Sequence, residues 1–405
     1  MLVYLRRIPN NYYYILGATV IMSVISFVIM KTVQARFGQD LFDNYLLILR
    51  YSGFLVPLIV LGLGVSIPRY VSFIRHQDKS FSNTNNIVDT GIVIISLSVI
   101  FTLIFGLSLN ALVDMDTFFF DGEGYFNLLL VYSSGLALFS YVYAVMRGFE
   151  EFKFIELIRI TILGIAGLYF IFTLENITEY LYAYTILNII VFIVIVRHKK
   201  IKITKKIDKD VVFFGLKRVA GDVSYPLLLS IPVIYTVNMI GSSYAAEISF
   251  YLMLINIFVL VINPISTIML TKAVTIVGSK IKLYEYIKFA LILSTAVSIL
   301  FQIGSPFIAN IFGYTLHAFD SIILAIIVFL LSIFVCIRSI IDAESVTPYL
   351  LRITIVSLSA EIACLIFLHY THNENIMSSY LVSITLLCLL AVQRYIEIYK
   401  NADNV

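Results

Sequence analysis

Several charged and polar side chains lie within long apolar stretches, and they are the first candidates for chemistry. A charge in hydrocarbon costs roughly 2.5–3.5 kcal/mol even on insertion scales, so it must face a cavity, a partner or the membrane surface. The clearest case is a set spaced to lie on one face of a continuous helix: Arg50, Gly53, Pro57, Leu61 and Gly64. The small residues predict that this face borders an open space. The alternative is that Arg50 extends from the end of its span to lipid phosphates.

A second polar helix face is predicted in the following half of the chain. Its members are Arg218, Asp222, Tyr225, Pro232 and Thr236. Arg218 and Asp222 are one turn apart and can form an ion pair, which would make them structural rather than ligand-binding. Pro226 and Pro232 are expected to break or bend this helix and to free carbonyl groups that a cavity or a neighbouring helix must satisfy.

Two more candidate sites follow along the chain. A third polar face consists of Ser249, Asn256, Asn263 and Thr267, which serve either a ligand or hydrogen bonds between helices. Glu361 is the deepest carboxylate, and Thr354 and Ser357 precede it on the same helix face. It is a candidate for ion or proton coupling. The alternative is a protonated glutamate hydrogen-bonded among the helices.

Membrane-spanning helices must position these residues. Apolar residues make up 60% of the 405-residue chain and charged residues 13%, against roughly 25% charged residues in a soluble domain. Continuously apolar stretches of about 20 residues recur from end to end, which predicts an all-α integral membrane protein rather than a β-barrel. We expect twelve spans: Tyr12–Met30, Tyr45–Ile67, Ile87–Leu109, Tyr125–Met146, Ile155–Thr173, Tyr180–Val196, Val219–Val237, Ile248–Leu270, Ile287–Ile308, Phe319–Ile341, Tyr349–His369 and Ser378–Ile398.

The polar stretch Arg197–Lys209 divides the chain into halves, with seven Lys/Arg in thirteen residues. Basic clusters beside spans stay in the cytoplasm, and the alternation of basic and acidic loops places both termini there too. We therefore expect a six-helix bundle at residues 1–196, a basic cytoplasmic linker at 197–210 and a second six-helix bundle at 211–405. This layout is typical of internally repeated transporters.

The remaining composition argues against several classes of protein. Cys336, Cys364 and Cys388 lie singly in apolar segments, which indicates neither a disulfide framework nor a metal site. A Gly-rich phosphate loop is missing from the sequence, so ATP hydrolysis is not encoded. We expect no enzymatic activity, no cofactor and no nucleic-acid partner. Membrane lipids are expected partners, since the basic linker is attracted to anionic lipid.

The segment Gln34–Phe73 resembles the polysaccharide-transporter branch, the Wzx-like O-antigen flippases, of the multidrug/oligosaccharidyl-lipid/polysaccharide (MOP) exporter superfamily. The residues that carry the resemblance are Gly38, Phe42 and Tyr45, followed by Leu61-Gly62-Leu63 and Arg69. Asp43 stands where that family usually has a second glycine. Softer matches are Tyr143–Gly148 with Phe152, Met239–Gly241 through Tyr251, Asn263–Ser266 and Ile311–Gly313.

This resemblance implies a MATE-like, V-shaped fold with a central cavity lined by spans one, two, seven and eight. It implies a flippase in the bacterial inner membrane that moves a polyprenyl-diphosphate-linked oligosaccharide, an O-antigen or capsule repeat unit, by alternating access. A polysaccharide polymerase and a chain-length regulator are the implied partners. Arg50 and Arg218 become candidate diphosphate ligands, because a guanidinium matches phosphate geometry in a bidentate way.

Three other functions are compatible with parts of the pattern. A multidrug exporter of the same superfamily would share the fold and differ in substrate. The peptidoglycan-precursor flippases usually have fourteen spans, so twelve argues against them. A membrane enzyme such as a polysaccharide polymerase or ligase typically has a large outer loop with catalytic Arg or His, whereas the outer loops expected here are short and acidic.

Overall fold

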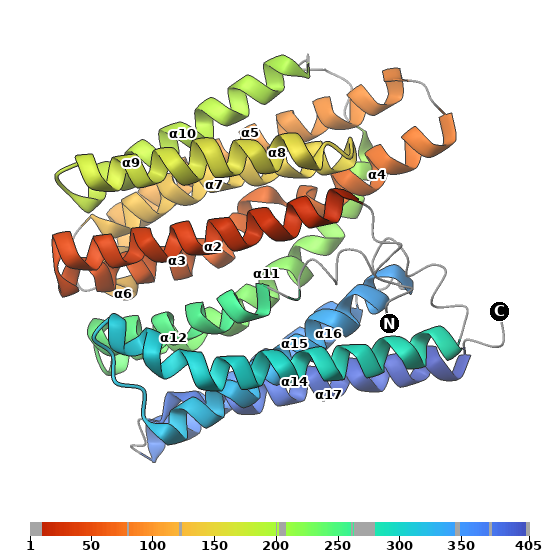
Figure 1. Cartoon of the computed structure of the whole chain (residues 1–405). Helices are drawn as coiled ribbons and strands as arrows, with labels where there is room; N and C mark the ends of the chain where they lie inside the picture. Colours follow the sequence, from red (N-terminus) through yellow and green to blue (C-terminus); the bar gives the residue numbers. More distant parts are fainter. Residues whose placement is uncertain are drawn as a thin grey trace. The chain divides into compact units, whose positions relative to one another are not determined.

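The structure is a computed structural model that describes residues 10–78, 81–120, 124–199, 201, 208–260, 262, 280–344, 349–371 and 375–401. These residues form helices and contain no strand (Figure 1). The helices are α2 (Asn10–Phe37), α3 (Gln39–Val60), α4 (Leu63–Asp78), α5 (Phe81–Val113), α6 (Met115–Phe119), α7 (Tyr125–Gly148), α8 (Phe152–Ile158), the π-helical segment η1 (Arg159–Ile165), α9 (Ala166–Thr173), α10 (Ile177–His198), α11 (Lys209–Met239), α12 (Ser242–Leu260), α14 (Lys280–Ile311), α15 (Ala318–Glu344), α16 (Tyr349–Tyr370) and α17 (Ile376–Asn401).

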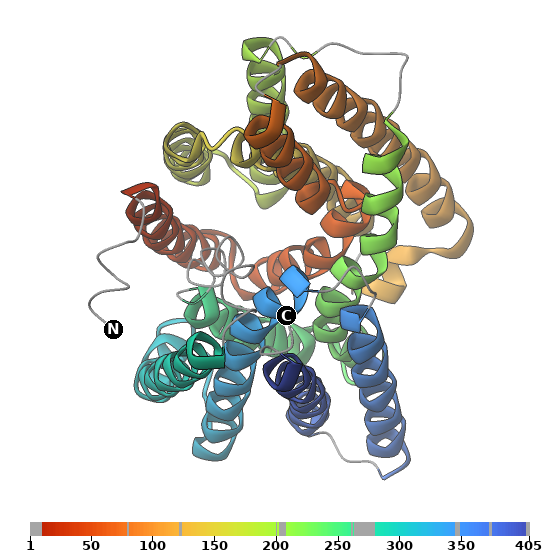
Figure 2. The ribbon, with the colours of Figure 1, turned by 90° about the vertical axis from the view of Figure 1, so that its right-hand side faces the viewer.

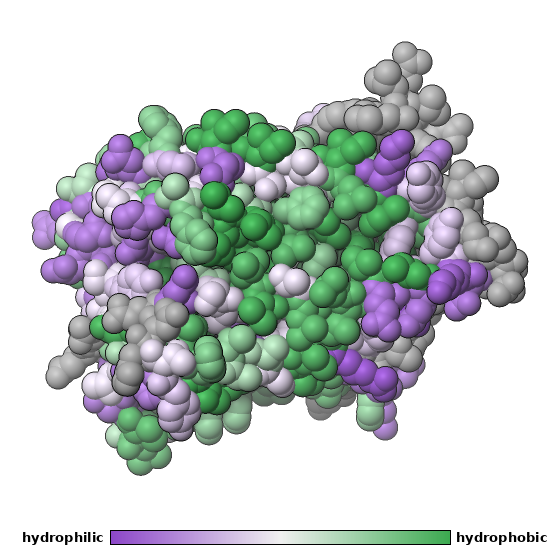
Figure 3. Space-filling model, turned by 90° about the horizontal axis from the view of Figure 1, so that it is seen from below, coloured by the Kyte–Doolittle hydropathy of each residue, from purple (hydrophilic) through white to green (hydrophobic). Residues whose placement is uncertain are grey.

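Twelve helices among the described residues are long and apolar enough to span a membrane, which confirms the predicted all-α membrane fold and the number of spans. The eleventh, α16, forms although Arg352 and Glu361 lie in it. Figure 3 shows one face of the surface, where hydrophobic residues occupy the middle and hydrophilic residues gather toward both ends. A hydrophobic middle between polar ends is what a bilayer requires of a multi-pass protein.

The chain forms two compact units. The first takes the chain to Pro226 together with Gly241–Ser243, and the second takes Leu227–Ile240 and the chain from Tyr244 onward. The division therefore falls within α11, later than the linker at 197–210 where the sequence suggests a domain boundary. The physical reason is that the N-terminal part of α11 packs on the first unit: Gly215 lies against the backbone of Leu61 and Gly62, and the Phe214 ring lies 4.7 Å from the Arg69 guanidinium carbon.

In the first unit the central helix is α7, which packs against α3, α4, α5 and α10. In the most apolar 18-residue stretch of α7, 67% of the residues are buried, which is as large a share as in any other span of the described residues. Tyr141 illustrates why: its ring is fully buried and its hydroxyl donates to the Val88 carbonyl. The helices α2, α8, η1 and α9 pack together beside this core, with α2 contacting each of the other three.

In the second unit the most buried helix is α15, which packs on α14 and α17. Figure 2 looks along these helices and shows α17 between α15 and α16, in agreement with its contacts to both. Two tyrosine hydroxyls form hydrogen bonds between helices of this unit. Tyr380 of α17 donates to the Leu229 carbonyl of α11 (3.0 Å), and Tyr286 of α14 donates to the Cys336 carbonyl of α15 (2.8 Å).

In the second span, one prediction from the sequence is wrong. The sequence analysis placed Arg50, Gly53, Pro57, Leu61 and Gly64 on one continuous helix. The helix α3 ends at Val60, and Leu61 (φ 52°) and Gly62 (φ 72°) take left-handed conformations before α4 begins. Because the helical repeat is interrupted there, Leu61 and Gly64 do not continue the face that carries Arg50. The interruption allows a close backbone contact, since a Cβ on Gly62 would lie 2.2 Å from the Gly215 carbonyl oxygen.

The sequence predicts that Pro226 and Pro232 break or bend the seventh span, and the structure shows no break. The helix α11 runs without interruption from Lys209 to Met239 through both Pro226 and Pro232. A different span is irregular instead. The fifth consists of α8, η1 and α9, and its π-helical turn of seven residues begins at Arg159. Such π-helical turns are often found at functional sites.

Candidate functional site

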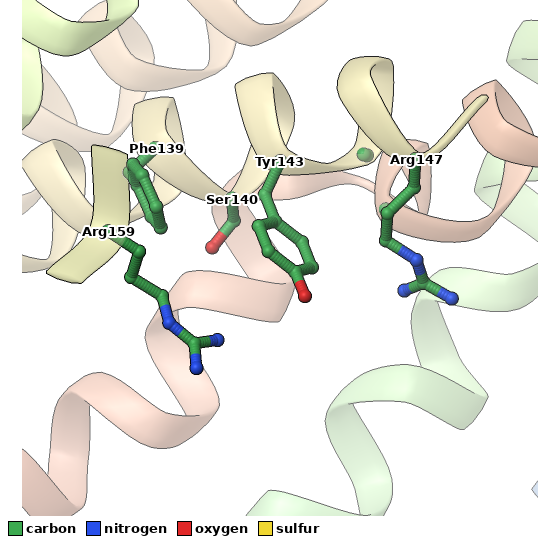
Figure 4. A pocket seen from close by; sticks show the side chains of 7 residues that line it. Phe139, Ser140, Tyr143, Arg147 and Arg159 are labelled. Atoms are coloured by element: carbon green, nitrogen blue, oxygen red, sulfur yellow. The ribbon is translucent and has the colours of Figure 1, made fainter. Parts of the chain in front are cut away.

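A pocket of about 260 Å³ lies within the first unit, between α4, α7 and η1 (Figure 4). Its lining combines two cations, two aromatic rings, a hydroxyl and two small residues: Gly64, Phe139, Ser140, Tyr143, Ala144, Arg147 and Arg159. The volume is slightly below the roughly 300–1,000 Å³ of sites that enclose a drug-sized ligand. It therefore suits part of a larger ligand, such as its head group.

One face of α7 supplies most of this lining. Phe139, Ser140, Tyr143, Ala144 and Arg147 recur at helical spacing, so their side chains project to the same side. In Figure 4 the side chains of Tyr143, Arg147 and Arg159 extend in the same direction. The ring centroids of Phe139 and Tyr143 are 6.2 Å apart, which forms an aromatic wall beside the arginines.

Gly64 of α4 keeps the opposite wall open. A Cβ placed on Gly64 would meet only the Val60 side chain, at 3.8 Å, which is ordinary contact. Its backbone is not in the left-handed region, so larger residues fit its conformation. The glycine therefore provides space for the pocket rather than a special backbone geometry.

Arg159 belongs to a buried charged network behind the pocket. Its Nε lies 3.1 Å from Oε2 of Glu156 in an ion pair, and its Nη2 donates to the Thr19 hydroxyl of α2 at 3.5 Å. The Tyr143 hydroxyl donates to the other carboxylate oxygen of Glu156, at 2.7 Å. The Glu156 residue is only 2% exposed. A carboxylate this deep is retained only with partners of opposite charge and hydrogen-bond donors, and Arg159 and Tyr143 supply both.

Arg147 is held more loosely. Its guanidinium carbon lies 5.9 Å from the centre of the Tyr143 ring, and among the described residues no carboxylate lies within ion-pair distance of it. Two guanidinium groups and one carboxylate leave the pocket and its network with a net charge of +1. Such a site attracts an anion, and guanidinium groups bind phosphate and carboxylate through paired N–H donors.

The described residues contain few groups that could bind a metal ion. Groups of three or more His, Cys, Asp or Glu side chains that could hold a metal are absent from the described residues. The three cysteines are free, with Cys336 and Cys388 buried and Cys364 partly buried. What the two arginines of the pocket offer is the binding of an anionic group.

The sequence-predicted residues of the first unit lie elsewhere. Arg50, on α3, is half-buried and does not line the pocket. Arg218 and Asp222 approach as predicted, with Nη2 3.9 Å from Oδ1, and both side chains are about one-fifth exposed. Tyr225 is half-buried one turn further along α11. The structure thus brings Arg218 and Asp222 together as the sequence predicts.

The second unit contains the other candidates. Asn256 is half-buried on α12, and Asn263 lies outside the described residues. Glu361 is fully buried on the inner face of α16, on the side that carries Thr354 and Ser357. The two hydroxyls donate to carbonyls of their own helix, those of Leu350 and Ile353, at 2.5 and 2.9 Å. A coupling role for Glu361 stays a prediction.

Sequence reasoning placed Gly64 beside an open space and noted Tyr143–Gly148 as part of the family resemblance, but it did not single out the charged residues of the pocket as a site. Glu156 and Arg159 fall inside the fifth apolar stretch, where the cost of a buried charge singles them out as it does Glu361. Their spacing of three residues also predicts an ion pair. Arg147 follows an apolar stretch as a single basic residue, which is common at the cytoplasmic end of a span. Its role depends on α4 and η1 lying beside α7, which no local pattern shows.

These observations define the class of protein: an all-α, multi-pass membrane protein with twelve candidate spans and a basic pocket in its first unit. No family model and no curated protein matches the sequence. Solved structures nevertheless share its fold over nearly the whole chain.

Three transporter structures illustrate the similarity. An inward-facing multidrug resistance MATE family transporter of the MOP superfamily has a TM-score of 0.66 at 14% identity, covering 95% of each chain. A MOP superfamily transporter from Pyrococcus furiosus has a TM-score of 0.65 at 15% identity, covering 97% of this chain and 95% of that one. A eukaryotic MATE transporter has a TM-score of 0.65 at 12% identity, covering 97% and 98%. The chain therefore has the fold of these MATE transporters, which confirms the MATE-like fold class predicted in the sequence analysis.

Proposed function

We propose that this protein is a membrane exporter that moves a polyprenyl-diphosphate-linked oligosaccharide across the bacterial inner membrane. A transporter fold supports export in general, and the observation that favours this substrate is the net positive charge of the Arg147–Arg159 pocket. A diphosphate is an anion whose oxygens match the N–H groups of arginine. The proposal includes cytoplasmic termini, a polysaccharide polymerase and a chain-length regulator as partners, and no catalytic activity.

The size and lining of the pocket fit a head group rather than a whole substrate. A volume of about 260 Å³ accommodates a diphosphate and the beginning of a sugar. The Phe139 and Tyr143 rings offer an apolar wall for the sugar, and the Ser140 hydroxyl offers a hydrogen-bonding group. The lipid tail remains in the bilayer. Arg50, Arg218, Asp222, Tyr225, Asn256 and Asn263 stay candidate contacts for the rest of the oligosaccharide.

The second candidate is a multidrug exporter, because the solved relatives in fold include multidrug resistance transporters. For a cationic drug, the pocket carries the wrong charge. Moving a cation beside two guanidinium groups is unfavourable, and the single carboxylate is already paired with Arg159.

Deletion of the gene in the native host separates the two candidates. We expect loss of surface polysaccharide and accumulation of lipid-linked repeat units on the cytoplasmic face. Complementation with the wild-type chain should restore export, whereas Arg147→Gln, produced at equal abundance, should not. Normal surface polysaccharide together with lowered efflux of a cationic dye would contradict the proposal and favour drug export.

A further inference from the structure

Glu156 is the buried group whose position calls for an explanation beyond packing. It is 2% exposed, it lies in a membrane-spanning segment, and it pairs with one of the two arginines that face the pocket. An apolar side chain would cost less at such a position, since buried ion pairs are seldom better than well-packed hydrophobic residues. The carboxylate therefore points to a role in the pocket.

We infer that Glu156 is a built-in competitor for the pocket: its carboxylate occupies Arg159 when the pocket is empty, and a phosphate-bearing head group binds in exchange for it. The inference rests on the proposed function, because it takes a diphosphate as the ligand. It assigns Glu156 as a residue that sets affinity and selectivity without being the ligand's main partner.

The geometry at Arg159 permits this exchange. A guanidinium has five N–H donors. Glu156 approaches at Nε, and Thr19 accepts from Nη2 at 3.5 Å, a long and therefore weak hydrogen bond. The Arg159 side chain is 20% exposed and lines the pocket, so part of this side chain is accessible from there. A phosphate can take that accessible part and then draw the group away from Glu156.

Tyr143 lowers the cost of this exchange, because it keeps a hydrogen bond to the Glu156 carboxylate. Its hydroxyl donates to Oε1 of Glu156 at 2.7 Å, on the oxygen opposite the ion pair. When Arg159 turns to a ligand, this hydrogen bond keeps the carboxylate in place and satisfied on one side. Tyr143 is thus a positioning residue, and its ring simultaneously forms the pocket wall.

Charge explains the selectivity that follows. With Glu156 ionised, the group of Arg147, Arg159 and Glu156 carries a net charge of +1. A monovalent anion gains little binding energy by replacing the Glu156 carboxylate, which is already paired with Arg159. A diphosphate brings more than one negative charge and several oxygens, so it can engage both arginines and outcompete the carboxylate. Glu156 therefore favours polyvalent anions and keeps their binding weak enough for release.

The test measures binding of inorganic pyrophosphate to the purified full-length protein in detergent by calorimetry. Glu156→Gln removes the competitor while keeping the shape and the hydrogen bond from Tyr143. We expect its Kd for pyrophosphate to fall by about tenfold or more, given the coupling energies of close charge pairs. Adding Arg159→Gln should abolish this gain. In transport assays the single variant Glu156→Gln should show a lower KM together with a lower maximal rate, because release of the substrate becomes slow.

Two variants keep the test decisive. Glu175→Gln changes the net charge equally at an exposed position on a connecting segment, and its Kd should equal that of the wild type. Glu156→Asp retains the charge but withdraws the carboxylate from Arg159, and its Kd should fall between those of wild type and Glu156→Gln, which supplies the answer if the glutamine variant does not fold. Unchanged or weaker pyrophosphate binding by folded Glu156→Gln or Glu156→Asp, with binding by the wild type, would overturn the inference alone. No binding by the folded wild type and both variants would overturn the proposed ligand as well.

Discussion

The two pocket arginines differ in what holds them, and this decides what each can do. Arg159 is tied to Glu156 and Thr19, so a ligand must compete for it. Arg147 lies over the Tyr143 ring at 5.9 Å, and no carboxylate among the described residues is paired with it. Arg147 should therefore supply the first contact to an incoming anion.

Replacing Arg147 tests this difference at the residue scale. Arg147→Gln should reduce transport per molecule by about tenfold or more, because a charge-assisted hydrogen bond is worth roughly twice a neutral one and the partner phosphate stays unpaired. Arg147→Lys should restore part of the activity, since the charge returns without the paired N–H geometry. Transport is measured against protein abundance. Full activity of Arg147→Gln would remove this residue from the site.

Filling the pocket is the second test at this scale. Gly64→Leu places a side chain in the space that Gly64 leaves open, where an added Cβ meets only Val60 at 3.8 Å. We expect near-complete loss of pyrophosphate binding with an unchanged melting temperature. Gly53→Leu is the matched control, because a Cβ on Gly53 meets no atom within 4 Å and Gly53 does not line the pocket. Equal binding by both variants would show that the ligand lies elsewhere.

At the scale of elements, the connection between α3 and α4 shapes the first unit. Leu61 and Gly62 are left-handed, and the Gly62 backbone lies directly against Gly215 of α11. This contact allows α4 to leave the direction of α3 and to bring Gly64 beside α7. A short irregular connection thus positions one wall of the pocket.

Substitution of Gly62 should therefore destabilise the unit. Gly62→Ala adds a Cβ at a φ of 72° and 2.2 Å from the Gly215 carbonyl oxygen. Strain of this kind costs of order 1–3 kcal/mol before the clash is counted. We expect a lower melting temperature and lower abundance in the membrane than for Gly53→Ala, which meets no atoms. A Gly62→Ala protein as stable as the wild type would contradict the contact.

The twelve spans could be predicted from the sequence, because each is a long apolar run and α16 tolerates its single buried glutamate. The end of α3 could not be predicted. Leu61-Gly62-Leu63 continues an apolar run, and what fixes the break is Gly215, far along the chain. The sequence also did not decide whether Pro226 and Pro232 break α11 or only bend it, since a proline costs a helix a hydrogen bond but does not necessarily end it. The pocket could not be predicted either, because it forms only where α4, α7 and η1 lie together. The sequence does show the charges of Glu156 and Arg159 within an apolar stretch.

At the scale of the whole molecule, the distribution of charge along the chain predicts its orientation. The basic stretch at 197–209 and the acidic connections beside Asp114 and Glu175 belong to opposite sides if each of the twelve helices crosses the membrane. The proposed export of a lipid-linked oligosaccharide from the cytoplasm requires this orientation.

Cysteine labelling tests the orientation. In a chain with Cys336, Cys364 and Cys388 replaced, Glu175→Cys should react with an impermeant thiol reagent in intact cells. Asp210→Cys, at a position that is also exposed, should react only after the cells are opened. The intensity of labelling is compared with that in permeabilised cells. Reaction of Asp210→Cys in intact cells would overturn the predicted topology.

The most direct measurement of the central claim is transport by the purified protein in liposomes. The substrate is a fluorescent, short-chain polyprenyl-diphosphate disaccharide, and its appearance in the opposite leaflet is followed with an impermeant quencher. We predict translocation by the wild-type chain, at least about tenfold slower translocation by an Arg147→Gln/Arg159→Gln double variant of equal abundance and melting temperature, and no competition by ethidium. Equal rates for the wild type and the double variant, or competition by ethidium, would contradict the claim that the arginine pocket selects an anionic head group.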